Sequence, residues 1–456
     1  MNKFPSLFCE RMKEELQEEY DSFIHSLNAC SPTSIRFNPG KPADCGSMDE
    51  YPLFQSRVEW SKYAIYLKER PVFTLDPIFQ GGGYYVQEAS SMFLEHILTQ
   101  LPLDRPLRVL DLCAAPGGKS TLLASVLPQD SLLVSNEVIS SRAAILKENI
   151  IKWGHDNIVV SNSDPSRFSK IKEAFDIIIV DAPCSGEGMF RKDPKAISEW
   201  SENNLQLCSS RQKRILSDIW ESLKPEGFLI YSTCTYNKGE NEEIIKWLTE
   251  NFDAESISID HAYPPIVSID SPIHAYQFYP HKIGGEGFFV GVVQKKGGSI
   301  YPTKREKSKI KSSRTLQLPE EVKKMIDPES DYYTYIYKNI YGIIPAMHAD
   351  FVSELESGLN VLYKGCELIE LNHQKIKPLH PMALYRHLNK KNCHLYDADR
   401  ETALKYLKKE EIPVQGESGE WVLVTYNNIG LGWCKNIGNR MNNYFPKELR
   451  IRMEIL

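Results

Sequence analysis

Apolar and polar residues alternate along the middle of the chain in a pattern of short strands and longer helices. Six runs rich in β-branched and aromatic residues predict strands, at 107–112, 131–137, 156–160, 175–183, 227–234 and 287–293. Helical periodicity occupies stretches between them, at 119–127, 140–153 and about 196–223. This alternation predicts an α/β fold with an open, largely parallel sheet. In such sheets ligands bind beyond the carboxyl ends of the strands.

The two ends of the chain have different patterns. Residues 6–27 carry apolar side chains at helical spacing and predict one amphipathic helix. The strand-like pieces SIRFN and SRVEW follow, separated by Pro and Gly, and complete a small α+β unit. Near the other end, residues 320–326 predict a helix, and EWVLVTYN, GLGWCKN and LRIRM predict short strands.

The composition is typical of a large folded protein. The 456 residues are 42% hydrophobic and 25% charged, which excludes a wholly disordered or collagen-like chain. At about 150 residues per domain, two to four domains are expected. No apolar run approaches the ~18 residues of a membrane span, and the N-terminal residues turn acidic before an apolar signal region forms. Ten cysteines occur without a CxxC pair or zinc-ligand spacing, so we expect free thiols, no metal and a cytoplasmic location.

Charge is unevenly distributed along the chain, although the net charge is only −6. Residues 295–314 include eight basic residues and one acidic residue amid Gly, Ser and Pro, which predicts an exposed basic linker. The linker could be a solvated tether or a nucleic-acid-binding tract, and the sequence leaves both alternatives open. Residues 360–456 carry 15 basic and 11 acidic residues. Four aromatic residues among them fit either the core of a small β domain or an RNA-holding surface: Trp421, Tyr426, Trp433 and Tyr444.

The turn DLCAAPGGKST, residues 111–121, joins the first predicted strand to the next helix. Gly117 and Gly118 would let the backbone approach a ligand closely, and the turn contains neither GxxxxGK[ST] nor GxGxxG. Taken alone, it is equally compatible with a tight strand–helix connection. Acidic residues near the next three strand ends, Glu137, Asp164 and Asp181, favour a ligand. In dinucleotide folds such a carboxylate holds the ribose hydroxyls, so the set predicts an adenosyl cofactor.

Two cysteines follow the neighbouring fourth and fifth strands, Cys184 in VDAPCSGEG and Cys234 in YSTCTY. Adjacent strand ends would bring both thiols into the same crevice. A lone buried cysteine usually serves packing, but a thiolate can add to an electron-poor carbon. Lys119, Arg191 and Lys192 could favour the ionised thiol. The residues themselves leave open which of the two thiols attacks.

Taken in order, DLCAAPGGKS, the acid in SNE, VDAPCSGEG, YSTCT and PHKIGGEGFFVGVV resemble motifs of the RNA (cytosine-5) methyltransferases of the Sun/RsmB/RsmF family. The similarity covers about residues 92–295, and FCERMKEELQEEYDSF and GGGYYVQEASSMF resemble the RsmF branch. The resemblance implies a Rossmann-like, class I S-adenosylmethionine-dependent methyltransferase core. The expected domains are an α+β RNA-binding domain (1–91), the catalytic domain (92–295), the basic linker (296–318), an intermediate domain (319–378) and a PUA-like RNA-binding domain (379–456).

The resemblance also implies a role for each candidate residue. S-adenosylmethionine would be held by Glu137 at the ribose, by Asp164 at the adenine, by Asp181 between cofactor and base, and by the turn. The turn residues are Cys113, Ala114, Ala115, Pro116, Gly117, Gly118 and Lys119. Cys234 would attack C6 of a cytosine, Cys184 would assist release, and Asp181 would protonate or hydrogen-bond N3. The base would come from single-stranded or locally opened RNA, with small-subunit ribosomal RNA expected and tRNA as the alternative.

Two other classes of function were weighed. A non-catalytic RNA-binding or assembly protein would be expected to lose a thiol or a cofactor acid, and all are present. Methylation of a small molecule or a protein needs no covalent adduct and hence no paired thiols. We expect a monomer with no membrane association. The segment after the linker is expected to add RNA affinity without chemistry, so that a chain ending near Lys296 keeps its sheet and cofactor site. The alternative is that this tail packs on the catalytic domain and supports its folding.

Overall fold

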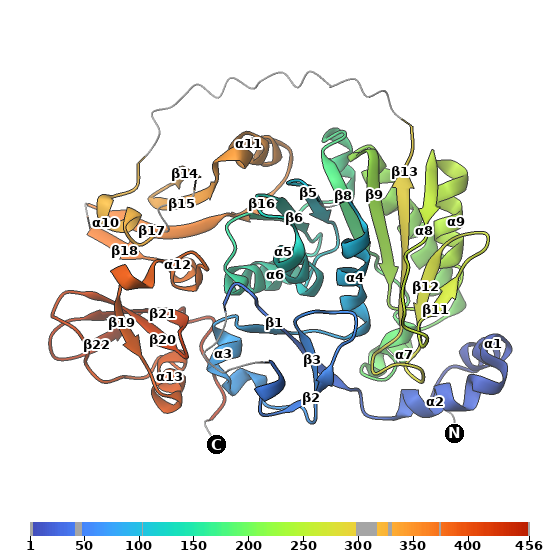
Figure 1. Cartoon of the computed structure of the whole chain (residues 1–456), viewed down its shortest axis with the longest axis horizontal. Helices are drawn as coiled ribbons and strands as arrows, with labels where there is room; N and C mark the ends of the chain where they lie inside the picture. Colours follow the sequence, from blue (N-terminus) through green and yellow to red (C-terminus); the bar gives the residue numbers. More distant parts are fainter. Residues whose placement is uncertain are drawn as a thin grey trace.

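A ten-stranded sheet crosses the middle of the molecule (Figure 1). The structure is a computed structural model that describes residues 3–41, 48–102, 104–297, 317–326, 331–373 and 375–454. Nine strands follow one another across the sheet: β11 (Val267–Ile269), β12 (Ala275–Phe278), β13 (Phe288–Lys295), β9 (Leu223–Thr233), β8 (Phe175–Asp181), β5 (Arg108–Asp111), β6 (Leu132–Asn136), β7 (Ile158–Ser161) and β16 (Val361–Lys364). The tenth, β10 (Ala254–Ile257), also pairs with β13. The five strands from β9 to β7 are mutually parallel, which confirms the α/β fold predicted from the alternating pattern.

Helices cover both faces of this sheet because its central strands are apolar on both sides. In β8, Ile177 and Ile179 join one buried cluster, and Ile178 and Val180 join the other. The first cluster takes side chains from α4 (Phe93–Gln100), α5 (Gly118–Val126) and α6 (Ser140–Trp153). The second takes side chains from α8 (Glu202–Trp220) and α9 (Glu242–Asn251). Residues that alternate along one strand therefore anchor two opposite helical layers.

Two predicted helices are each divided in the structure. The stretch 196–223 consists of α7 (Pro194–Glu199), α8 and the start of β9. Ser201 interrupts it, because its side chain accepts a hydrogen bond from the Asn204 amide and caps a new helix. The stretch 6–27 consists of α1 (Ser6–Leu16) and α2 (Tyr20–Asn28), separated at Gln17, whose φ is 47°.

The N-terminal α+β unit is attached firmly to the catalytic domain. Its sheet has the order β2 (Phe54–Arg57), β3 (Ala64–Leu67), β1 (Thr33–Phe37) and β4 (Tyr84–Val86). Arg36 of β1 is 1% exposed and reaches into the catalytic domain. Its guanidinium donates to Thr121 Oγ1 at 2.7 Å and to Gln87 Oε1 at 2.9 Å, and it lies 4.8 Å from the Trp153 ring centroid. The first strand of the unit therefore supports the helix that follows the glycine-rich turn.

The segment expected to form an intermediate domain is divided between two sheets. Four of its strands form a sheet of their own: β14 (Tyr332–Tyr337), β15 (Ile340–Pro345), β17 (Cys366–Asn372) and β18 (Lys375–Pro378). Its strand β16 instead pairs with β7 at the edge of the catalytic sheet. Between them α11 (Ala349–Gly358) places Phe351 5.9 Å from the Phe175 ring. The tail therefore packs on the catalytic domain, which corrects the expectation that it adds only RNA affinity.

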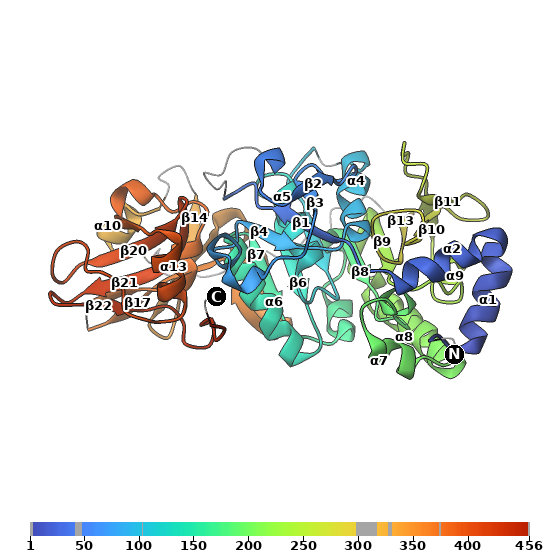
Figure 2. The same ribbon diagram turned by 90° about the horizontal axis from the view of Figure 1, so that it is seen from below.

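The last module contains a sheet of β19 (His394–Asp397), β20 (Trp421–Tyr426), β21 (Ile429–Asn436) and β22 (Met441–Asn443), with α13 (Arg400–Leu407) against it. The prediction of a strand at LRIRM is wrong: residues 449–453 form no strand, and Ile451 is buried in the core of the module. Trp433 is 2% exposed and is a core residue, whereas Tyr444 is 39% exposed. The C-terminal modules and α1 lie at opposite ends of the elongated molecule (Figure 2).

Short elements complete the chain. They are α3 (Pro77–Gln80), α10 (Glu320–Lys323) and α12 (His380–Leu384). The helix predicted at 320–326 is thus one turn long. Most of the predicted basic linker, residues 298–316, lies outside the described residues. Within the described part of the chain no helix is long and apolar enough to cross a membrane, and no three His, Cys, Asp or Glu side chains are grouped to hold a metal ion.

Candidate active site

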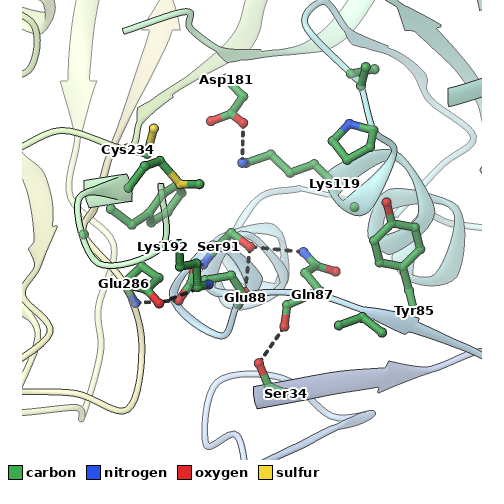
Figure 3. A pocket seen from close by; sticks show the side chains of 18 of the residues that line it. Ser34, Tyr85, Gln87, Glu88, Ser91, Lys119, Asp181, Lys192, Cys234 and Glu286 are labelled. Carbon is green, nitrogen blue, oxygen red and sulfur yellow. Dashed lines mark hydrogen bonds and ion pairs between the residues drawn. The ribbon is translucent and has the colours of Figure 1, made fainter. Parts of the chain in front are cut away.

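A cavity of about 600 Å³, the active-site crevice, lies where β5, β8 and β9 end and the N-terminal domain covers the sheet (Figure 3). Predicted site residues line one side of it: Cys113, Ala114, Ala115, Pro116, Gly118, Lys119, Asp181 and Cys234. The N-terminal domain and the connection to α4 line the opposite side with Ser34, Tyr85, Gln87, Glu88 and Ser91. Sequence reasoning missed this second wall, because no local motif shows which residues a separate domain turns toward a strand end.

The glycine-rich turn is shaped by its own backbone and by α6. Gly117 has φ 117°, which side-chain-bearing residues rarely adopt, and Leu146 of α6 lies 3.4 Å from where a Cβ would be. Arg142 donates to the Ala115 carbonyl at 2.8 Å, and Asn149 donates to the Pro116 carbonyl at 2.8 Å. The turn is therefore held open toward the crevice by side chains of the next helix.

Asp111, at the carboxyl end of β5, also lines the crevice and was not singled out from the sequence. It is fully buried, and its Oδ2 accepts a hydrogen bond from Ser120 at 2.6 Å. Its Oδ1 has no hydrogen-bond partner among the described residues. Burial raises the pKa of Asp111 to about 7. Its place at a strand end, the rule applied to Glu137, would have found it.

Glu137 and Asp164 lie outside the crevice. Glu137 is 2% exposed, and its Oε1 accepts from the Ile139 amide at 2.9 Å. Its buried Oε2 makes no hydrogen bond within the described chain and lies 3.4 Å from Arg142 Nη1. Asp164 is exposed and caps a 3-10 turn by accepting from the Ser166 hydroxyl and amide, which lowers its pKa. Of these two residues, only Glu137 therefore has a buried oxygen that can accept a further hydrogen bond.

The two thiols lie side by side, with Cys184 Sγ 3.3 Å from Cys234 Sγ. Cys234 lines the crevice, whereas Cys184 is not among its lining residues. The hydrogen bond to Cys234, together with burial, raises the pKa of the Cys184 thiol well above its usual value. Either sulfur can be the donor in this contact, so the two thiols share one hydrogen bond.

The basic residues proposed to favour a thiolate have carboxylate partners in the structure. Lys119 Nζ lies 2.8 Å from Asp181 Oδ2, and Ser232 donates to the other Asp181 oxygen at 2.8 Å. Burial is the largest influence on the pKa of Lys119 and lowers it, but the charge and hydrogen bond of Asp181 and the charge of Asp111 together outweigh it, so the pKa is raised. Arg191 and Lys192 contact Glu286 at 2.9 and 3.0 Å. These pairs balance the charges of the crevice and fix where each carboxylate points.

A buried carboxylate behind the thiols joins the two loops that carry them. Glu240 accepts from the Ser185 amide at 2.9 Å, from the Ser185 hydroxyl at 2.6 Å and from Gln212 at 3.1 Å. The Ser185 hydroxyl also lies 2.9 Å from Thr235 Oγ1, next to Cys234. Burial raises the pKa of Glu240 to about 6. This network keeps the two sulfur atoms at a fixed separation.

The N-terminal helix α1 supports the same loops. Arg11 pairs with Glu187 at 2.7 Å, and Glu187 is fully buried. The other Glu187 oxygen accepts from the Tyr236 amide at 3.1 Å, two residues after Cys234. The Gly188 amide donates to the Cys234 carbonyl at 2.8 Å. The N-terminal helix and the loops near Glu187 and Tyr236, far apart in the sequence, therefore hold Cys234 in place together.

Three family models match the chain in order. They are described as the N-terminal domain of 16S rRNA methyltransferase RsmF at residues 4–89, 16S rRNA methyltransferase RsmB/F at 98–294 and the methyltransferase RsmF PUA domain at 393–451. A ribosomal RNA small subunit methyltransferase F from Shewanella woodyi is 31% identical over 81% of this chain and 79% of its own. Another with that name from Enterobacter sp. is 28% identical over 98% of this chain and 96% of its own.

Solved structures share the catalytic fold. A methyltransferase homolog protein from Pyrococcus horikoshii is 28% identical with a TM-score of 0.55, covering 64% of this chain and 95% of that one. NSun6 from the same organism, at 19% identity, shares the fold with a TM-score of 0.54 over 65% of this chain and 100% of its own.

Proposed function

Because the chain belongs to the family of the ribosomal RNA small subunit methyltransferases F, we propose that it transfers a methyl group from S-adenosylmethionine to C5 of a cytosine in small-subunit ribosomal RNA. One observation carries the chemistry. Two thiols 3.3 Å apart stand at a crevice that also contains a glycine-rich turn and the Asp181 carboxylate. Simple transfer to an oxygen or an amine would not need the second sulfur.

The residues present fit S-adenosylmethionine, which supplies the methyl group on a sulfonium centre. Asp111 Oδ1 and Glu137 Oε2 are buried carboxylate oxygens without hydrogen-bond partners in the described residues. Buried polar oxygens are costly unless a donor reaches them. The ammonium and ribose hydroxyl groups of the cofactor are such donors. The turn from Cys113 to Lys119 would line the methionine and ribose side, and Asp164 would accept from the adenine.

Cys234 would be the nucleophile. C5 of cytosine is a weak nucleophile, and addition of the Cys234 thiolate to C6 gives it enamine character, so that it takes the methyl group. Loss of the C5 proton then re-forms the C5–C6 double bond and expels the Cys234 thiolate. One feature supports this assignment: Cys234 lines the crevice, whereas Cys184 does not. Cys184 would assist the release step from its place 3.3 Å away.

Asp181 would hold the cytosine ring by donating a proton to N3 as the thiolate adds to C6, and the carboxylate so formed would pair with Lys119. The base must leave its stack to reach the crevice. The wall formed by Ser34, Gln87 and Ser91 would face the flipped nucleotide. The N-terminal domain (1–91) and the PUA-like domain (379–456) would hold the surrounding RNA, with one copy of the chain sufficient.

Bisulfite sequencing tests the substrate. Small-subunit ribosomal RNA and tRNA would be compared between cells with and without the gene. A cytosine that resists conversion in ribosomal RNA only when the gene is present is the expected result. A protected cytosine in tRNA alone would reassign the substrate. Unchanged protection in both, with the purified protein inactive on both RNAs, would contradict the proposed function.

A further inference from the structure

A second cavity, of about 510 Å³, lies where the N-terminal domain meets the C-terminal modules; we call it the basic pocket. It is lined by Gly40 and Lys41, by the segment from α12 to the start of β19, and by the turn between β20 and β21. Four of its lining residues are basic, namely Lys41, Arg386, Lys390 and Lys391. Among the described lining residues none is acidic.

Backbone carbonyls hold the basic side chains of this pocket in place. Lys41 Nζ donates to the Lys152 carbonyl at 2.6 Å and to the Gly81 carbonyl at 3.0 Å. Lys390 Nζ donates to the Asn428 carbonyl and, at 3.2 Å, to its side-chain oxygen. Neutral acceptors orient both side chains. Burial lowers the pKa of Lys41 to about 7, so the lasting charge of the pocket comes from Arg386, Lys390 and Lys391. The pocket therefore presents a fixed positive surface rather than a set of internal ion pairs.

Arg386 also lines the pocket. Its backbone amide donates to the Gly154 carbonyl at 3.0 Å, and Nη1 lies 3.4 Å from His155 Nε2. Its buried Nε has no hydrogen-bond partner in the described residues. Burial, and after it the charge of Arg386, lower the pKa of His155 well below its usual value, so this neighbour stays neutral. A buried donor without an acceptor is a cost that an anionic ligand would remove.

We propose that the basic pocket binds backbone phosphates of the RNA whose cytosine enters the active-site crevice, an inference that rests on the proposed function. Strand β1 and the turn that follows it connect the two sites. Thr33 and Ser34 line the crevice, and Lys41 lines the basic pocket. Eight residues span at most ~26 Å at ~3.3 Å each, so the two sites lie no farther apart than about eight phosphates along one strand at ~3.4 Å each. A single RNA element can therefore reach both sites, and a phosphate in the pocket would fix the register of the target base.

Two lysines of the pocket provide the test. The variant Lys390→Gln/Lys391→Gln removes two charges and keeps side-chain length and polarity. The matched control, Lys172→Gln/Lys338→Gln, removes two lysines that are exposed and outside the pocket. Binding of a small-subunit ribosomal RNA transcript would be measured over a salt series. We expect the slope of log K against log salt to fall by about 1 for each lysine, and thus by about 2 in the pocket variant.

Methyl transfer by the same variants separates this inference from the proposed function. The pocket variant should keep kcat at saturating RNA and affinity for S-adenosylmethionine, while its KM for RNA rises. Lys391→Gln alone should show half the change in slope, which guards against a folding defect in the double variant. An unchanged slope in a variant that melts like the wild type would overturn the proposal, as would an equal change in the control. The proposal would also be overturned if inorganic phosphate raised the melting temperature of the wild type but not of the pocket variant, while the salt slope of RNA binding was the same in both. An inactive wild-type enzyme would instead overturn the proposed function, whatever the slopes.

Discussion

The active-site crevice and the basic pocket are both formed where the N-terminal domain meets another part of the chain, but their charges are arranged in opposite ways. In the crevice Lys119 pairs with Asp181, and Arg191 and Lys192 pair with Glu286. In the basic pocket Lys41 and Lys390 donate to carbonyl groups, and no described lining residue is acidic. One site is internally neutralised, and the other keeps its charge.

The difference follows from what each site would bind. Chemistry on a bound base needs a carboxylate at a fixed position, and a partner of opposite charge, here Lys119 for Asp181, fixes it. Binding to an RNA backbone draws its free energy from neutralised phosphates and released counterions, which internal carboxylates would reduce. The comparison predicts that substitutions in the crevice change chemistry or cofactor affinity, whereas those in the basic pocket change salt-dependent RNA binding.

The largest effect on methyl transfer at an intact fold is expected at Cys234. Cys234→Ala removes the only sulfur atom of the thiol pair that lines the crevice, so methyl transfer to RNA should fall by more than ~1000-fold. Affinity for S-adenosylmethionine should change little. Transfer of a radiolabelled methyl group to small-subunit ribosomal RNA provides the measurement. Cys30→Ala, at an exposed cysteine, is the matched control and should keep full activity. If Cys234→Ala kept its activity, the assignment of the chemistry to the active-site crevice and of RNA binding to the basic pocket would be contradicted.

Removal of everything after Lys296 should unfold the catalytic domain rather than only weaken RNA binding. Phe351, Val352, Leu355 and Leu359 are buried against the sheet. At roughly 1.5–3 kcal/mol for each buried side chain, their loss is comparable to the whole stability of a domain. It also exposes β7 as an edge strand. Thermal melting with and without S-adenosylmethionine measures this. A truncated chain that melts like the full one would show that the tail is independent.

A single substitution provides a milder version of that experiment. Phe351→Ala should lower the free energy of unfolding by about 3–5 kcal/mol, because it leaves a cavity under α11. Tyr337→Ala, at a side chain that is 65% exposed, should cost little. Urea unfolding of both variants would measure the difference. Equal midpoints would mean that the contact between α11 and the sheet contributes nothing to stability.

Glu137→Ala should weaken the binding of S-adenosylmethionine by about 10- to 150-fold, because a loss of ~1.5–3 kcal/mol is typical for a hydrogen bond to a charged group. Calorimetric titration gives the affinity. Asp164→Ala is the companion variant. If Asp164 accepts from the adenine, its affinity falls as well; if it only caps the turn, melting changes and affinity does not. Unchanged affinity in a folded Glu137→Ala protein would contradict the ribose role.

The smallest effect is expected at Glu240. Its raised pKa means that ionisation opposes folding, so stability is full below the ordinary value of 4.5 and declines as pH rises through about 6. Glu240→Gln cannot ionise and should lack this decline, which amounts to about 2 kcal/mol for a shift of that size. Urea unfolding of wild type and variant between pH 4 and pH 8 would show it. If the free energy of unfolding changed with pH in the same way in wild type and variant, the raised pKa of Glu240 would be contradicted.

Local patterns predicted the elements of the catalytic sheet well, because apolar periodicity reports burial directly. The helix α6 begins and ends at the predicted residues, Ser140 and Trp153. The break at Ser201 depended on one capping hydrogen bond. The LRIRM segment was misjudged because Leu449 and Ile451 pack into the core of the last module without a partner strand, while Met453 is exposed. Periodicity also gave no sign that β16 would return to β7.

The candidate site was predictable to the extent that it lies at strand ends. Motif order placed Cys184, Cys234 and Asp181 in one region, and their juxtaposition follows from parallel pairing of β8 and β9. The second wall, which includes Gln87 and Ser91, depends on how two domains dock, and no periodicity in either segment encodes that. The network around Glu240 was equally hidden, since it joins residues 55 positions apart.

The covalent role of Cys234 is tested most directly by looking for a protein–RNA adduct. Cys184→Ala enzyme would be incubated with small-subunit ribosomal RNA and S-adenosylmethionine and then run on a denaturing gel. We predict that a slowly migrating complex accumulates, because addition at C6 proceeds while release is blocked, and that Cys184→Ala/Cys234→Ala gives none. An adduct in Cys234→Ala but not in Cys184→Ala would reverse the two roles. If the wild type methylates the RNA and no variant forms an adduct, covalent catalysis is contradicted.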